Sequence, residues 1–272
     1  MRVGIALPSA ESDGSPLHAT SLADAARRIE DTGFSSAWVF DAIGRGFLLP
    51  DPLTSLAVAA TVTRTIELGT GILQVPLRNP VELAQRALTT HLLSAGRLIL
   101  GVGAGSTAAD FAALGFEFDA RFRRLDESLT TMRALWAGKR VGEAELGQIW
   151  PTALGGPRVM IGSWAGSQWL ARAAREFDGW IGSGARSTWG LLEKGIARFR
   201  SLGGKRAIVT NVHVRFEDTP SPDGPDDPAN LVGPYEVARE RLERLRQLGF
   251  DDVVLVARQH DAASLRKIRA LG

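Results

Sequence analysis

Glycine recurs where apolar runs of the chain end, and backbone N–H groups exposed there could bind an oxyanion. The clusters lie at residues 69–71, 101–105, 162–163 and 179–184. A glycine lets a flat or phosphorylated ligand approach the backbone closely, and free N–H groups attract negative charge. A single cluster is most simply a turn. The four clusters together predict a broad ligand that lies over these strand ends.

Two titratable side chains follow the first apolar runs. Asp41 comes directly after residues 36–40, and His18 lies in the loop after residues 2–7. Asp41 is a candidate for a polar contact to a cofactor or for a proton relay, and a helix or loop cap is its structural alternative. His18 is a candidate for a ligand contact because its loop follows the end of a strand, as the glycine clusters do. His260, by contrast, is expected at the surface.

Two arginines follow the second and third runs, and one histidine falls within a later run. Arg45 and Arg78 could supply positive charge to an anionic ligand, although surface salt bridges explain them equally well. His213 lies inside an expected strand and could line the interior of the fold.

Other kinds of chemistry lack the residues that they require. The chain has no cysteine, which excludes disulfides, thiolate metal sites and thiol catalysis. A Schiff-base aldolase or isomerase would need a lysine at a strand end. Lys139, Lys194 and Lys267 fall on expected helices, and Lys205 precedes a strand at its amino end. These positions argue against that class of enzyme.

The charge balance gives no sign of a nucleic-acid partner. Lysine plus arginine (32) exceeds aspartate plus glutamate (30) by only two. The pI of about 9.4 reflects the small number of groups that titrate between neutrality and pH 10. No apolar run approaches the roughly 20 residues that cross a bilayer, and the N-terminus is too polar for a signal peptide. We therefore expect a cytoplasmic protein without membrane or nucleic-acid partners.

Strand and helix patterns alternate along all 272 residues. Strands are expected at 2–7, 36–40, 66–71, 97–103, 158–163, 178–184, 206–216 and 251–258. Helices are expected at 21–34, 51–63, 79–96, 123–138, 166–177, 187–203, 233–250 and 261–272. Eight such units in one domain, 1–272, predict an α/β fold of the (β/α)8 TIM-barrel type. The alternative is a doubly wound open sheet, but no Gly-x-Gly-x-x-Gly follows the first strand.

Local signals refine this pattern. Ser21 and Asn79 are expected helix N-caps, with Pro80 at the first helical position. The segment Phe216–Gly233 is rich in proline, aspartate and glycine. It is expected to be either a flexible surface loop or a lid over the active face.

Several segments, in order, resemble the bacterial luciferase-like flavin oxidoreductases. The most specific is "RTIELGTGILQVPLRNPVELAQRALTTHLLSAGRLILGVGAGS", in which a strand, an Arg-x-Pro turn, a helix and a glycine-ended strand follow one another. "ADAARRIEDTGFSSAWVFD", "RFRRLDESLTTMRALWAG" and "GSQWLARAAREFDGW" match further parts of the family pattern, and the resemblance covers nearly the whole chain. It implies a barrel that binds FMN or the deazaflavin coenzyme F-420 at its carboxyl face.

The resemblance also implies site residues. Gly71 and Ile72 would form a bulge behind the cofactor ring, and a non-proline cis peptide bond at this place would indicate a functional role. The ribityl chain and the phosphate would contact the next two strand ends: Gly103, Gly105 and Ser106 for the ribityl chain, and Gly162, Ser163 and Ser167 for the phosphate. Trp164 interrupts the second of these loops and could stack on a ring. Barrel phosphate sites more often follow strands seven and eight, which leaves the phosphate assignment open.

The resemblance implies hydride transfer between the cofactor ring and a small organic substrate, with oxygen insertion as a variant when FMN is bound. We expect a homodimer, as relatives often pair through their second and third helices. One departure stands out: many relatives carry a histidine after the acid that matches Asp41, and this chain has Ala42. The alternative is therefore a cofactor-binding barrel without catalytic turnover.

Overall fold

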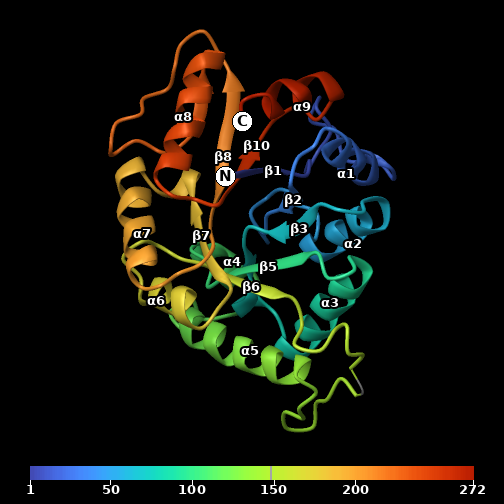
Figure 1. Cartoon of the computed structure of the whole chain (residues 1–272). Coiled ribbons are helices and arrows are strands. Elements are labelled where there is room, and N and C mark those ends of the chain that lie inside the picture. The colour runs from blue at the N-terminus through green and yellow to red at the C-terminus, as the bar shows by residue number, and fades with distance from the viewer. Residues whose placement is uncertain (148) are drawn as a thin grey trace.

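Parallel strands alternate with helices along the chain, and the strands close into a barrel (Figure 1). The computed structural model describes residues 1–147 and 149–272. In this part of the chain the barrel strands are β1 (Arg2–Ala6), β2 (Ser36–Val39), β3 (Glu67–Thr70), β5 (Leu98–Gly103), β6 (Arg158–Gly162), β7 (Gly179–Ser183), β8 (Ala207–Phe216) and β10 (Asp252–Val256). Because β10 pairs in parallel with both β8 and β1, the barrel closes. The predicted (β/α)8 fold is confirmed.

Helices surround the barrel, as Figure 1 shows. They are α1 (Ser21–Asp31), α2 (Pro52–Val62), α3 (Pro80–Leu93), α4 (Ala108–Ala113), α5 (Arg121–Trp136), α6 (Gln168–Arg175), α7 (Trp189–Ser201), α8 (Tyr235–Gln247) and α9 (Ala262–Arg269). The expected positions agree closely, except that the sequence did not predict α4. Among the described residues, no helix combines the length and apolar character needed to span a membrane.

The helix caps agree in part with the sequence. Asn79 accepts hydrogen bonds from two backbone N–H groups of the first turn of α3, and Pro80 opens that helix. The expectation for α1 was wrong, because its N-cap residue is Thr20. Ser21 lies one position further on, and its hydroxyl contacts Glu11 and His18 instead. The hydroxyl therefore joins the loop after β1 to the start of α1.

Side chains fill the barrel interior. They form a cluster that is separate from the larger core between the strands and the helices. One apolar residue from each of several strands meets there: Trp38, Ile99, Met160, Ile181, Ile208 and Val254. Trp38 needs space on both sides. A Cβ at Gly69 on β3 would lie 2.4 Å from its ring, and one at Gly4 on β1 would lie 3.1 Å from its Nε1. These two glycines make room for the indole.

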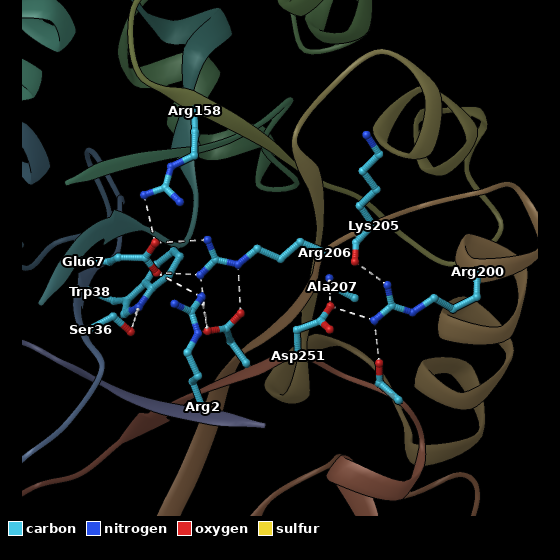
Figure 2. A network of polar contacts seen from close by, with 12 residues as sticks. Arg2, Ser36, Trp38, Glu67, Arg158, Arg200, Lys205, Arg206, Ala207 and Asp251 are labelled. Carbon is cyan, nitrogen blue, oxygen red and sulfur yellow. Dashed lines mark hydrogen bonds and ion pairs between the residues drawn. The ribbon is translucent and has the colours of Figure 1, made fainter. Parts of the chain in front are cut away.

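Charged side chains close the amino end of the barrel. Figure 2 shows three arginines that converge on Glu67: Arg2 on β1, Arg158 on β6 and Arg206 directly before β8. Asp252 at the start of β10 pairs with Arg2 and Arg206 and is buried. Since the active face of such barrels is the opposite end, this network contributes to stability.

The proline-rich segment after β8 is attached to the sheet near its end, and also to α8. It ends in the strand β9 (Leu231–Gly233), which extends the sheet in parallel beside the end of β8. Arg241 on α8 is buried, and its guanidinium donates to carbonyl groups of Ser221 and Val232. Hydrogen bonds from Arg241 thus hold Ser221 and Val232 near the two ends of this segment, and half of the residues between them are exposed.

Candidate active site at the carboxyl end of the barrel

The segment that follows β3 turns across the carboxyl end of the barrel. The peptide bond between Gly71 and Ile72 is cis. The short strand β4 (Leu73–Gln74) then pairs with the end of β5, and a 3-10 turn, η1 (Val75–Leu77), leads to α3. The segment therefore presents Ile72 beside the ends of β5 and β6.

The glycines at these strand ends have a packing role that the sequence did not reveal. A Cβ at Gly162 would lie 2.4 Å from Cγ2 of Ile72, and a Cβ at Gly103 would lie 3.0 Å from its Cδ1. A Cβ at Gly101 would lie 2.0 Å from the carbonyl oxygen of Thr70. These glycines bring neighbouring strand ends together, so they are not by themselves evidence for a ligand.

Asp41 holds the segment after β3 in place. Its carboxylate accepts from both terminal nitrogens of Arg78, at 2.7 and 3.0 Å, and from the backbone N–H of Gln74 at 2.8 Å. The Asp41 side chain is only 2% exposed. All these contacts are within the protein, so the geometry favours a positioning role. Direct contact of Asp41 with a cofactor stays a prediction.

A second buried carboxylate extends this network. Asp110 on α4 is fully buried and forms a two-point pair with Arg45, with both distances 2.6 Å. It also accepts from Nε2 of Gln74 at 2.8 Å. Burial alone would raise the pKa of Asp110, but the hydrogen bonds from Arg45 and Gln74 and the charge of Arg45 outweigh it, and the pKa lies below its ordinary value. Arg45 and Arg78 are thus both engaged in ion pairs.

Buried hydroxyl groups without a protein partner lie at the ends of β6 and β7. Within the part of the chain that the structure describes, the Oγ atoms of Ser163 and Ser183 have no hydrogen-bond partner. Ser183 stands two residues after Ile181 on β7. Since Ile181 points into the barrel and side chains of a strand alternate, Ser183 lies on the same interior face. Ser163 is one of the residues predicted from the sequence; Ser183 is not, although it lies inside the glycine cluster at 179–184.

The other predicted cofactor residues lie around these two strand ends. Trp164, after β6, is 47% exposed. Ser106, after the neighbouring strand β5, is also exposed. Ser167 caps α6, accepting from the backbone N–H of Trp169. Gly105 has a left-handed backbone, with a φ of 81°, and faces the side-chain amide of Gln74. The structure thus brings the predicted residues to one face of the barrel.

Two adjoining cavities open on the same end of the barrel, beside β10, β1 and β2. The larger, about 490 Å³, is lined mainly by polar residues from the loops that precede α1 and α9. The smaller, about 250 Å³, is lined mainly by apolar residues at the ends of β1, β2 and β10. Five residues line both: Pro8, Ala10, Glu11, Arg258 and His260.

Two histidines belong to these cavities. His18, the predicted ligand contact, lines the larger one, and its Nδ1 lies 2.9 Å from the hydroxyl of Ser21. His260 lines both, although the sequence placed it at the surface. No local pattern marks His260, because closure of the barrel brings β10 beside β1. His213, the other histidine considered for the interior, is exposed.

Comparisons with known proteins define the class of this barrel. The family model described as luciferase-like monooxygenase matches residues 1–221. The chain belongs to the luciferase-like monooxygenase family.

Its relatives include enzymes of two kinds. The F420-dependent glucose-6-phosphate dehydrogenase of Amycolatopsis mediterranei is 38% identical over 128 residues, which cover 44% of this chain and 38% of that protein. The 4-hydroxyprotoasukamycin monooxygenase of Streptomyces nodosus subsp. asukaensis is 36% identical over 111 residues, 40% of this chain and 30% of that protein. The matched parts thus span less than half of either relative.

Solved structures agree on the fold. Monooxygenase RslO1 from Streptomyces bottropensis superimposes with a TM-score of 0.77 at 18% identity, covering 100% of this chain and 97% of that one. The oxygenating constituent of 3,6-diketocamphane monooxygenase from Pseudomonas putida, in complex with FMN, gives a TM-score of 0.76 at 17% identity, covering 100% and 96%. At such identity the likeness supports the fold alone.

Proposed function

We propose that this protein is an oxidoreductase that uses FMN or the deazaflavin coenzyme, with the deazaflavin coenzyme as the preferred one. The observation that carries the proposal is the pair of unpartnered buried hydroxyls of Ser163 and Ser183, on neighbouring strands at the carboxyl end. An unsatisfied buried polar group costs about 1–3 kcal/mol, so a ligand with polar edges would stabilise these groups. The preference for the deazaflavin coenzyme draws on the named dependence of the first relative.

The residues at the carboxyl end fit such a cofactor in chemistry. Ser163 and Ser183 would offer hydroxyls, Gly103, Gly105 and Gly162 would offer backbone, and Trp164 would offer an aromatic face. When bound, the cofactor supplies hydride transfer with a small organic substrate. The protein itself positions the segment after β3 through Asp41 and Arg78. The cavities beside β1 and β10 would place the substrate next to apolar walls at the same end of the barrel.

Titration of the purified chain with each cofactor tests the proposal. We expect quenching of cofactor fluorescence on binding, tighter for the deazaflavin coenzyme. Ser183→Ala should weaken that binding about tenfold, the order expected for one hydrogen bond in a buried site. Ser201→Ala, at the exposed end of α7, is the matched control and should bind as the unaltered chain does. Failure of both cofactors to bind would reject the proposal.

Turnover separates this proposal from the alternative of a barrel that binds a cofactor without catalysis. The absence of a histidine after Asp41 is the feature that favours the alternative. Steady consumption of reduced cofactor with an added organic acceptor rejects the alternative. Tight cofactor binding without turnover, over a broad set of acceptors and alcohols, would favour it.

A further inference from the structure

His260 is held at the mouth of the barrel in one defined orientation. Its Nε2 lies 2.8 Å from the carbonyl oxygen of Ala6 at the end of β1, and its own carbonyl accepts from Nε of Arg28 on α1. A carbonyl oxygen can only accept a hydrogen bond, so Nε2 must carry the proton. In a neutral ring the lone pair is then on Nδ1, and that nitrogen is an acceptor.

Several conditions keep this ring neutral near pH 7. Burial is the largest influence and lowers the pKa of His260 below its ordinary value. The hydrogen bond with Ala6 and the charge of Asp261 oppose this lowering of the pKa without reversing it, and the charge of Arg28 adds to it. The other charged or titratable groups around the larger cavity are Glu11, His18, Asp24, Arg258 and Asp261. The carboxylate of Asp261 is engaged in capping α9.

The polar groups opposite His260 largely satisfy one another. The hydroxyl of Ser21 donates to Glu11, and it lies 2.9 Å from both the backbone nitrogen and Nδ1 of His18. Three groups of the polar cavity are therefore committed to each other. His260 differs from them, because its hydrogen bond to the protein uses only the donor nitrogen.

The smaller cavity offers the apolar half of a binding site next to this acceptor. It is lined by His260 and by apolar side chains from three strand ends and the loop after β2, including Leu7, Val39, Phe40, Leu49 and Pro50. A dry apolar cavity of about 150 Å³ holds benzene, so a volume of about 250 Å³ suits a monocyclic body. Phe40 also lies next to Gly71, one of the predicted cofactor-binding residues: its ring is 3.4 Å from the position that a Cβ on Gly71 would take.

We propose that the joined cavities bind a small uncharged amphipathic alcohol, with its apolar body in the smaller cavity and its hydroxyl donating to Nδ1 of His260. This names the substrate class for the proposed oxidoreductase and rests on that function. A charged group would lose hydration against the apolar walls of the smaller cavity. An uncharged hydroxyl group loses little hydration free energy there, and it donates a hydrogen bond to Nδ1 of His260. His260 thereby determines specificity.

A matched pair of probes tests the proposal directly. 2-Phenylethanol and its methyl ether share one apolar body, but only the alcohol can donate a hydrogen bond. By calorimetry we expect the alcohol to bind about tenfold more tightly, as one hydrogen bond predicts. In protein with ¹⁵N-labelled histidine, the alcohol should shift the unprotonated nitrogen of His260 and the ether should not.

The His260→Gln variant separates recognition from structure. The amide of glutamine can keep the donor to Ala6 but places no acceptor where Nδ1 was. We expect the alcohol to bind this variant as weakly as the ether does, while the ether and the cofactors bind as before. His213→Gln, at an exposed position on β8, is the control and should retain the preference for the alcohol.

The possible outcomes are distinct. Equal affinity for alcohol and ether, undiminished alcohol binding to His260→Gln, or no binding of either probe with and without saturating cofactor would overturn the assignment. Loss of cofactor binding by the unaltered chain would instead reject the proposed function, because the alcohol preference is measured on the cofactor-free protein as well.

Discussion

At the scale of single residues, the carboxyl end of the barrel depends on carboxylates that are buried and paired. Asp110 shows this most clearly, because it is fully buried and joins Arg45 and Gln74 to α4. Removing one partner of a buried pair leaves the other without compensation, which costs more than the pair itself contributes. The site is therefore sensitive to substitutions that touch no ligand.

We predict that Asp110→Asn destabilises the protein by about 2–3 kcal/mol at pH 7, since Arg45 is partly exposed and water would offset part of its loss. Urea unfolding measures this. The matched control is Glu127→Gln, which breaks an exposed pair with Arg123 and should change stability by less than about 0.5 kcal/mol. Equal effects of the two substitutions would contradict the importance of burial.

At the scale of elements, Ile72 and the glycines of β5 and β6 form one packing unit. A Cβ at Gly162 would come within 2.4 Å of Cγ2 of Ile72, closer than packed atoms allow. We predict that Gly162→Ala costs about 1–3 kcal/mol of stability through overpacking. Since Ile72→Ala removes Cγ2, the same glycine substitution should cost less in that background.

The double-mutant cycle measures this coupling by denaturation of the four proteins. Gly166→Ala is the control, because nothing lies within 4 Å of the position of its Cβ. Additive costs at residues 72 and 162 would show that the glycine serves something other than the fit of Ile72. In that case ligand contact would become the better explanation for Gly162.

The elements also show what the sequence could and could not predict. The strands and helices of the barrel follow local periodicity, so their order and positions were predictable. The strand β4 has two residues and exists only because β5 lies beside it, and β9 likewise depends on β8. No local pattern encodes such pairings.

The candidate site residues differ in the same way. The residues after β5 and β6 stand out as glycine clusters in the sequence, while His260 and Ser183 acquire their surroundings only when distant strands meet. The reason for the glycines also depended on the folded state, since neighbours such as Ile72 and Trp38 occupy the space that they leave.

At the scale of the whole molecule, the homodimer expected from the family resemblance stays a prediction. Light scattering coupled to size exclusion should give twice the chain mass of 29.2 kDa at micromolar concentration. A mass equal to that of one chain would reject the dimer. It would leave the proposed site intact, because the residues assigned to it come from one chain.

The charged network at the amino end of the barrel ties together strands that are distant in sequence. Glu67 on β3 pairs with Arg2, Arg158 and Arg206 (Figure 2), and its side chain is only 14% exposed. Burial would raise the pKa of Glu67, but the hydrogen bond and charge of Arg206 and the charges of Arg2 and Arg158 outweigh it and lower the pKa below its ordinary value of 4.5. Folding is thus linked to the ionised form.

This linkage fixes the sign of a pH effect. A carboxyl group with a lowered pKa in the folded state stabilises fully above the pKa of the unfolded chain, and this contribution is lost as the pH falls through the folded value. We predict that Glu67→Gln costs about 1–3 kcal/mol at pH 7, and that the difference from the unaltered chain shrinks as the pH falls below 4.5. Urea unfolding of both proteins between pH 7 and pH 3 measures it. A difference that stays constant over this range would mean that ionisation of Glu67 is not the source of the stabilisation, because the pKa of a stabilising carboxylate must be lower in the folded chain.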